Sequence, residues 1–349
     1  MQSTGLATAS VIDVHAHIVI QETMGAAGEF GPFIGQNPDG TPYFQVGANY
    51  RLDGVRYVGS PFMDADVRLR RMAERGIDFQ VLSPNPLTYF HFIRDQDAIR
   101  FCQVHNDCAA ATVRQHPYHL AAFAALPLQA PQAAVDELRR AVTELGLVGA
   151  AFGTDARLAL DAPALDALYA EAVRLDVPLF IHPGPAGIDG PKGDPALKRF
   201  DLDIIAGFAA QETLAVATLI YGGVLDRHPG LDICMSHGGG ATALLMGRMA
   251  KGARKRPWSP AALRPDGAFE ERVQRLWFDT HVDHPLVLPL LSAAVGRAHL
   301  VYGTNFAGWD EPDAPERGSG GTAASLVAPP DLADNARRLL RAGASVAAQ

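Results

Sequence analysis

The sequence predicts a single (β/α)8 barrel of the TIM type, in which eight parallel strands form a closed sheet inside a ring of helices. Short runs of β-branched and apolar residues alternate with longer segments of helical period along most of the chain. Such an order favours parallel strands with right-handed crossovers, and eight strands favour a closed barrel. The 349 residues are 48% hydrophobic and 19% charged, which is enough apolar material for one large core.

The first predicted helix shows the local signals most clearly. Asp64 stands at the N-cap position and Gly76 ends the helix. Between them, Val67, Leu69 and Met72 share one face. Strands are predicted at residues 11–17, 77–82, 120–126, 147–152, 177–182, 231–237, 276–280 and 299–303. Helices are predicted at residues 65–75, 99–113, 133–145, 162–175, 213–225, 241–253, 285–295 and 335–342.

A doubly wound open sheet is the competing architecture, because it shows the same alternation. Such sheets commonly carry a glycine-rich phosphate-binding loop after the first strand, and none follows residues 11–17. We therefore expect one catalytic domain over residues 1–349. Residues 18–62 form a long insertion after the first strand without sustained helical or strand period, and we expect this insertion to cover the active site.

Composition and charge exclude several classes of protein. A formal net charge of −8 and a pI near 5.8 argue against nucleic acid and anionic membranes as partners, because both need clustered Lys and Arg. Cys102, Cys108 and Cys234 are too few and too scattered for a disulfide framework or a thiolate zinc site. The N-terminus lacks a secretory pattern, and no run approaches the roughly 18 apolar residues that span a bilayer. We therefore expect a cytoplasmic protein.

A barrel places its catalytic groups at the carboxyl ends of its strands. The first strand ends in His15 and His17, whose imidazoles share one face because side chains alternate along a strand. Such a pair suits a shared metal, but it is also found among ordinary buried residues. Further polar side chains at later strand ends then favour the metal: His182, His237, Asp279 and Asn305.

Other residues near the predicted barrel mouth have less certain roles. Asp279 either orients a ligand histidine or accepts backbone hydrogen bonds. His91, His281 and His284 lie in loops near the mouth, where they either contact substrate or have a structural role. The predicted pocket walls are Phe62, Tyr89, Phe90 and Trp309.

Motifs spread over most of the chain resemble one family. Besides the histidines, they are residues 63–68 (MDADVR), 125–131 (ALPLQAP), 144–146 (ELG), 222–224 (GGV), 234–240 (CMSHGGG), 303–306 (GTNF) and 334–336 (DNA). As a set they resemble the metal-dependent amidohydrolase superfamily, in its branch around aminocarboxymuconate semialdehyde decarboxylase. The resemblance covers residues 11–340 and is weakest in the loops.

The resemblance implies a role for four of the strand-end histidines. It implies that His15, His17 and His182 bind a divalent metal, which is usually zinc and in related aromatic-acid decarboxylases sometimes manganese. It also implies that His237 acts mainly as the acid or base beside the metal rather than as a ligand.

The resemblance further implies that two arginines bind a substrate carboxylate. The best matches are Arg56 in the long insertion and Arg256 after the sixth strand, the second of which would be donated by the partner in a homodimer. Taken alone, each would be a solvated surface arginine. The planar fork of arginine nonetheless suits a carboxylate better than a lysine does.

One position departs from the family. The family normally has Asp where this chain has Asn305, and that Asp is a metal ligand and a candidate proton carrier. An amide oxygen coordinates weakly and an amide does not carry a proton in that way. Three histidines and a water molecule remain an established catalytic zinc arrangement. Asp310 is a candidate replacement, because Gly308 permits the chain to fold back.

We therefore expect a metal-dependent decarboxylase, a C–C lyase, that acts on a small unsaturated or aromatic carboxylic acid. Two alternatives stay open. The first is a metal-dependent hydrolase of an amide, lactone or C–C bond on the same scaffold. The second is a metal-free, catalytically silent binding protein in which Asn305 marks a lost metal site.

Overall fold

Parallel strands form a closed barrel in the computed structural model, which describes residues 5–48, 50–282, 284–311 and 330–342. The strands are β1 (Ile12–Ile18), β5 (Phe79–Pro84), β6 (Leu120–Ala122), β7 (Ala124–Ala125), β8 (Ala150–Gly153), β9 (Leu179–His182), β10 (Ile233–Met235), β11 (Trp277–Asp279) and β12 (Leu300–Val301). β6 and β7 together occupy the third strand position. This arrangement confirms the predicted (β/α)8 fold.

Backbone hydrogen bonds close the sheet at two places where the named strands are interrupted. Phe123 separates β6 from β7, and its N–H donates to the carbonyl of Leu82 at 2.8 Å, which holds this strand position beside β5. Between the last strand and the first, the N–H of Val14 donates to the carbonyl of Tyr302 at 2.9 Å. The eight strand positions therefore form one continuous cylinder.

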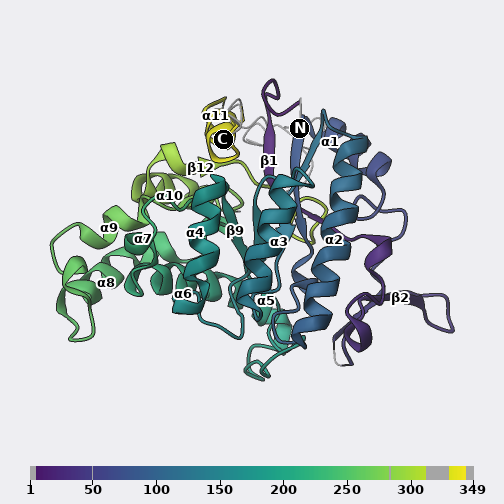
Figure 1. Cartoon of the computed structure of the whole chain (residues 1–349), viewed down its shortest axis with the longest axis horizontal. Coiled ribbons are helices and arrows are strands. Elements are labelled where there is room, and N and C mark those ends of the chain that lie inside the picture. The colour runs from purple at the N-terminus through teal and green to yellow at the C-terminus, as the bar shows by residue number, and fades with distance from the viewer. Residues whose placement is uncertain (1–4, 49, 283, 312–329, 343–349) are drawn as a thin grey trace.

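A ring of helices surrounds the cylinder (Figure 1). The first is capped as predicted, since the carboxylate of Asp64 accepts the N–H of Val67 at 3.0 Å and Gly76 adopts a φ of 69°. The principal helices are α1 (Ala65–Arg75), α2 (Asp95–Gln115), α3 (Pro131–Thr143), α4 (Asp166–Leu175), α6 (Gly207–Tyr221), α8 (Thr242–Lys255), α10 (Val287–Val295) and α11 (Pro330–Leu339). Short helices are α5 (Leu202–Ile205), α7 (Val224–Arg227) and α9 (Ala268–Val273).

Most boundaries lie within about five residues of the prediction, and two differences matter for the fold and the site. The helix predicted at residues 213–225 begins earlier, at Gly207, and is divided because Gly223 adopts a φ of 73°. The strand predicted to reach residue 237 ends at Met235, and His237 begins a 3-10 turn. His237 therefore projects from a tight turn rather than from a strand.

The insertion at residues 18–62 differs most from the prediction. We found no strand period there, but the structure contains an antiparallel sheet of β2 (Phe33–Gln36), β3 (Pro42–Val46) and β4 (Tyr50–Asp53). Its buried residues Phe44 and Val46 join a cluster with Phe90 after β5 and Phe101 on α2. The insertion therefore packs beside one side of the barrel mouth, and its role as a cover stays a prediction.

The strand side chains divide between two apolar clusters. One set of alternate strand residues joins residues of α11 inside the cylinder: Ile12, Val14, Phe79, Val81, Phe180, Val301, Ala333, Ala336 and Leu339. The other set packs beneath the outer helices. α11 lies near the start of β1 (Figure 1), so it closes the amino-terminal end of the barrel. The opposite end, where the strands finish, holds the polar side chains of His15, His17, His182 and Asp279.

One helical stretch is long and apolar enough by length and composition to cross a membrane, Arg199–Tyr221. The sequence contains no unbroken apolar run of that length, because acidic residues interrupt this stretch. Its residues Val216, Leu219 and Ile220 are buried in the core cluster of the barrel wall. A core helix meets the same criterion, and the absence of a membrane partner stays a prediction.

Candidate metal centre and active site

The three histidines predicted as metal ligands meet at the carboxyl end of the barrel. Nε2 of His17 lies 3.2 Å from Nε2 of His15 and 3.3 Å from Nε2 of His182. All three side chains are buried, with 3% or less of their surface exposed. The strands β1 and β9 therefore bring residues that are 165 positions apart in the sequence to one point.

The opposite ring nitrogen of each histidine is held in place. Nδ1 of His15 lies 2.7 Å from a carboxylate oxygen of Asp279, at the end of β11. Nδ1 of His17 lies 3.2 Å from the carbonyl of Pro84, and Nδ1 of His182 lies 2.6 Å from the carbonyl of Pro183. Each Nδ1 therefore carries its hydrogen toward an acceptor, which turns the lone pair of Nε2 toward the other histidines.

The electrostatics keep these imidazoles in the form that binds cations. Burial lowers the pKa of His15 from 6.5 to about 4, although the adjacent Asp279 acts in the opposite direction. Burial also holds the pKa values of His17 and His182 well below the usual range. Neutral imidazoles present a free lone pair at neutral pH, as a metal ligand requires.

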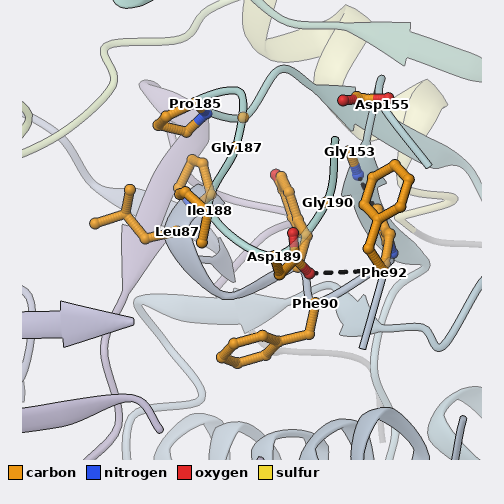
Figure 2. Close-up of a pocket in the computed structure, with 14 residues that line it drawn as sticks. Leu87, Phe90, Phe92, Gly153, Asp155, Pro185, Gly187, Ile188, Asp189 and Gly190 are labelled. Atoms are coloured by element: carbon orange, nitrogen blue, oxygen red, sulfur yellow. Dashed lines mark hydrogen bonds between the residues drawn. The ribbon is translucent and has the colours of Figure 1, made fainter. Parts of the chain in front are cut away.

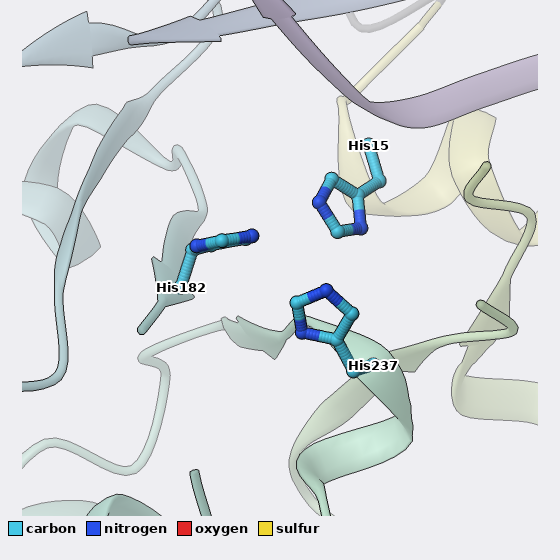
Figure 3. Close-up of side chains that lie close together, drawn as sticks. All are labelled: His15, His182 and His237. Carbon is cyan, nitrogen blue, oxygen red and sulfur yellow. The ribbon is translucent and has the colours of Figure 1, made fainter. Parts of the chain in front are cut away.

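The spacing of the nitrogens fits a shared divalent cation. Two nitrogens bound to one zinc at about 2.0–2.1 Å, with angles of roughly 90–110°, lie about 2.8–3.4 Å apart. The measured separations of 3.2 and 3.3 Å fall inside this range. The donor atoms of His15, His182 and His237 also lie within 4.8 Å of one another, and Figure 3 shows their rings pointing toward a common space.

Asp279 has the contacts that both of its predicted roles require, one to His15 and two to backbone N–H groups, while its role toward a metal ligand stays a prediction. While Oδ2 contacts His15, Oδ1 accepts the backbone N–H groups of Gly238 and His281, each at 3.1 Å. Burial acts to raise the pKa of Asp279, but the charge and hydrogen bond of His15 outweigh it, and the pKa lies below its usual value. An ionised carboxylate therefore ties three strand-end loops together.

His237 is held by a carboxylate that sequence analysis missed. Its Nδ1 lies 2.7 Å from Oε1 of Glu212, a fully buried residue of α6 that also accepts the hydroxyl of Ser236. Burial acts to lower the pKa of His237, but Glu212 outweighs it and raises that pKa to about 9. Glu212 is the one charged residue of Gly207–Tyr221. A single acidic residue in an otherwise apolar helix is a pattern from which its functional role could have been suspected.

Asp310 folds back toward this site, as the sequence allowed. Its Oδ1 accepts the amide N–H of Asn305 at 2.6 Å, and its Oδ2 lies 3.2 Å from Nε2 of His281. Donor atoms of His237, His281 and Asp310 lie within 4.8 Å of one another. Asn305 itself is 9% exposed and follows β12 beside β1, where the N–H of Phe306 donates to the carbonyl of His15 at 3.3 Å.

A cavity of about 260 Å³ opens directly beside His237. Its walls combine apolar and polar side chains, which are Ile204, Ile205, Phe208, Ala209, Glu212, Gly240, His281, Val282, Trp309 and Asp310. The size approaches that of pockets that hold small ligands. This cavity is the best candidate for the substrate site, and Trp309 lies in its wall as predicted.

Tyr89 lines a different cavity. That space of about 30 Å³ lies over the ends of β5, β8 and β9, and Figure 2 shows Phe90, Gly153, Asp189 and Gly190 among its walls. It has room for one or two water-sized groups rather than for a ring. Phe90 shares this smaller cavity and Phe62 lines a third, so the four predicted wall residues do not form one pocket.

A buried polar network lies under the metal centre. Arg68 of α1 donates to Gln80 at 2.9 Å and to the carbonyl of His17 at 2.5 Å. Gln80 in turn donates to Asp13 at 2.9 Å, and Asp13 accepts the N–H of His15 at 3.0 Å. Arg68, Gln80 and Asp13 were not predicted, because neither period nor spacing in the sequence indicates that a charged helix residue points inward.

The family model described as amidohydrolase matches residues 12–342. The chain belongs to the amidohydrolase family. A 2-amino-3-carboxymuconate-6-semialdehyde decarboxylase from Dictyostelium discoideum is 30% identical over 298 residues, 84% of this chain and 81% of the relative. A gamma-resorcylate decarboxylase from Rhodococcus jostii is 34% identical over 248 residues, 67% of this chain and 69% of the relative. These relatives confirm the predicted branch of the superfamily and the predicted enzyme class, a carboxy-lyase.

A solved structure supports the fold of this amidohydrolase independently. A dihydroxybenzoic acid decarboxylase from Polaromonas sp. JS666, with bound manganese and 2-nitroresorcinol, superimposes with a TM-score of 0.70 at 21% identity. The match covers 95% of this chain and 97% of the other. The relative holds a divalent metal, and the histidines of this amidohydrolase are suited to hold one.

The two predicted carboxylate-binding arginines are both exposed. Arg56 is exposed in the insertion after β4, and Arg256 is exposed where α8 ends. Neither contributes to the wall of the cavity beside His237. Their contact with substrate stays a prediction, which for Arg256 includes a second subunit.

Proposed function

We propose that this amidohydrolase is a metal-dependent decarboxylase of a small unsaturated or aromatic carboxylic acid. The observation that carries the proposal is the convergence of the Nε2 atoms of His15, His17 and His182 beside a cavity that contains His237. The two named decarboxylases that align with most of the chain support the same reaction. The apolar walls of the cavity suit a planar unsaturated acid.

We propose His15, His17, His182 and the amide oxygen of Asn305 as the metal ligands. Three imidazoles form a nitrogen-rich donor set, which suits zinc, while manganese is the alternative because a structural relative contains it. A divalent cation bound there would act as an electrophile that draws negative charge from the substrate as the carboxylate is lost.

His237 is proposed as the proton donor. Because Nδ1 contacts Glu212, Nε2 is the nitrogen that is available to substrate. Nε2–H gives its proton to the carbon that bears the carboxylate, and the π electron pair of a C=C bond at that carbon forms the new C–H bond. The bond from that carbon to the carboxylate then breaks, its electron pair returns to the unsaturated system and CO₂ leaves. Glu212 keeps the imidazole charged and correctly turned for this step.

We propose that Arg56 and Arg256 bind the substrate carboxylate in a homodimer, with Arg256 reaching the partner's site. An apolar surface supports this assembly. Leu244 on α8, Leu286 before α10 and Leu290 on α10 are 74%, 73% and 43% exposed, and Trp258 beyond Arg256 is 52% exposed. Helices α8 and α10 are in contact, and several large exposed apolar side chains on neighbouring helices are consistent with an interface.

Analysis of products tests the reaction. Incubating the metal-loaded protein with a panel of aromatic and muconate-type acids should release CO₂ with the replacement of one carboxylate by hydrogen. Formation of a second carboxylate with uptake of water would instead identify the hydrolase alternative. Protein that takes up no metal and turns over no acid of the panel, but still binds one of them, would identify the metal-free, catalytically silent binding protein.

A further inference from the structure

Asp310 contacts the side chain of Asn305, and both of its oxygens are engaged by neighbouring side chains. Oδ1 accepts the amide of Asn305 at 2.6 Å, and Oδ2 lies 3.2 Å from Nε2 of His281. An ionised carboxylate only accepts hydrogen bonds, so the amide must turn its nitrogen toward Asp310. The amide oxygen of Asn305 is consequently directed away from Asp310 and remains available to another partner.

The turn that brings Asp310 to this position is specifically built. The N–H of Gly308 donates to the carbonyl of Asn305 at 2.8 Å. A Cβ at residue 308 would lie 2.7 Å from that carbonyl oxygen and 2.8 Å from the amide nitrogen of Asn305, which is closer than real Cβ atoms approach. Only glycine therefore allows the chain to pass so close to the Asn305 side chain.

Negative charge is scarce among the proposed ligands. His15, His17, His182 and Asn305 are all neutral donors, so the charge of a divalent cation must be balanced by groups outside the ligand set. Asp279 balances it on one side through its contact with His15. On the other side, the carboxylate that contacts a proposed ligand is Asp310.

We propose that Asp310 is a positioning residue for the metal centre, which supplies through Asn305 the negative charge and the amide orientation that a ligating carboxylate would otherwise provide. This inference rests on the proposed metal site. Asn305 and Asp310 then act as a pair. The amide oxygen of Asn305 binds the cation, and the carboxylate of Asp310, hydrogen-bonded to the amide nitrogen, supplies the negative charge. His281 holds the second carboxylate oxygen and fixes the plane of the group.

Exchanging the side chains of Asn305 and Asp310 tests whether the two residues act as a pair. Apoprotein is titrated with Zn²⁺ and with Mn²⁺ by calorimetry for the unaltered chain, Asp310→Asn, Asn305→Asp and the double exchange Asn305→Asp/Asp310→Asn. Asp266→Asn serves as the control for net charge. It removes the same charge as Asp310→Asn, but from a side chain that is 95% exposed and pairs with Arg254. Thermal denaturation with and without metal accompanies each titration.

The single Asp310→Asn substitution should weaken metal binding by about 10- to 100-fold, while the melting temperature of the apoprotein stays close to that of the unaltered chain. The double exchange should recover the affinity, because the pair again contains one carboxylate and one amide. Asn305→Asp alone should lower the melting temperature of the apoprotein, since two carboxylates then face each other, and metal should restore it.

Three outcomes decide the matter. Unchanged metal affinity in Asp310→Asn would overturn the inference. A double exchange that binds metal as weakly as Asp310→Asn would also overturn it, because a purely structural role does not recover when the charge is relocated. If the unaltered chain itself binds neither metal, the proposed metal site fails instead, and the two failures are thereby distinguished.

Discussion

Nδ1 of His15, on the first strand of the barrel, lies 2.7 Å from Oδ2 of Asp279, at the end of the seventh strand position. Both side chains are fully buried. The contact fixes the imidazole so that Nε2 faces His17, and it places an ionised carboxylate next to a group that is proposed to bind a cation. The seventh strand would therefore act on the proposed metal site through His15 rather than by direct contact.

Substitution Asp279→Asn should lower metal affinity by about 10- to 100-fold, because it removes the charge that supports His15. The amide can still accept from one backbone N–H, so the fold should persist. Metal titration of the apoprotein measures the effect, and circular dichroism checks the fold. Affinity equal to that of the unaltered chain would show that Asp279 has a structural role only.

Substitution Glu212→Gln should move the pH dependence of turnover. His237 must be protonated to donate, and Glu212 raises the pKa of His237 to about 9, so activity should fall as pH rises through that pKa. Without the negative charge the pKa falls, and the alkaline limb of the profile should therefore shift to lower pH. Turnover at neutral pH should fall by about 10- to 100-fold. An unshifted limb would exclude His237 as the donor.

Substitution Arg68→Met should lower the free energy of unfolding by about 3 kcal/mol or more, because it leaves the buried Gln80 and Asp13 without their cationic partner. Arg70→Met is the matched control, since Arg70 is an exposed arginine on the same helix. Urea denaturation of both variants measures the difference. A loss below about 1 kcal/mol for Arg68→Met would show that the network is not needed for stability.

The sequence predicts those features that depend on a few neighbouring residues, such as helix caps, helix stops and strand ends. The N-cap at Asp64, the stop at Gly76 and the histidines at the ends of β1 and β9 follow from short patterns, and the structure contains them as predicted. The antiparallel sheet of the insertion escaped prediction because its strands are only four or five residues long and β2 and β4 have no fully buried residues, so any apolar alternation is too short to stand out.

Contacts across large sequence separations are harder to predict. Glu212 meets His237 from a helix of the barrel wall, and Arg68 meets Gln80 beneath the sheet, through packing that no local pattern records. The return of Asp310 to Asn305 depends on the close approach of the chain at Gly308, where a Cβ would not fit, and the sequence permits this approach without requiring it. The proposed placement of Arg256 at a substrate site would require a second chain, which one sequence does not describe.

The central claim is that three histidines from β1 and β9 bind one divalent cation. Elemental analysis of protein expressed with added zinc and manganese tests it most directly, on the unaltered chain, His182→Ala and His237→Ala. We predict about one equivalent of metal in the unaltered chain and in His237→Ala, and less than about a tenth of an equivalent in His182→Ala. Full metal content in His182→Ala, or none in the unaltered chain, would contradict the claim.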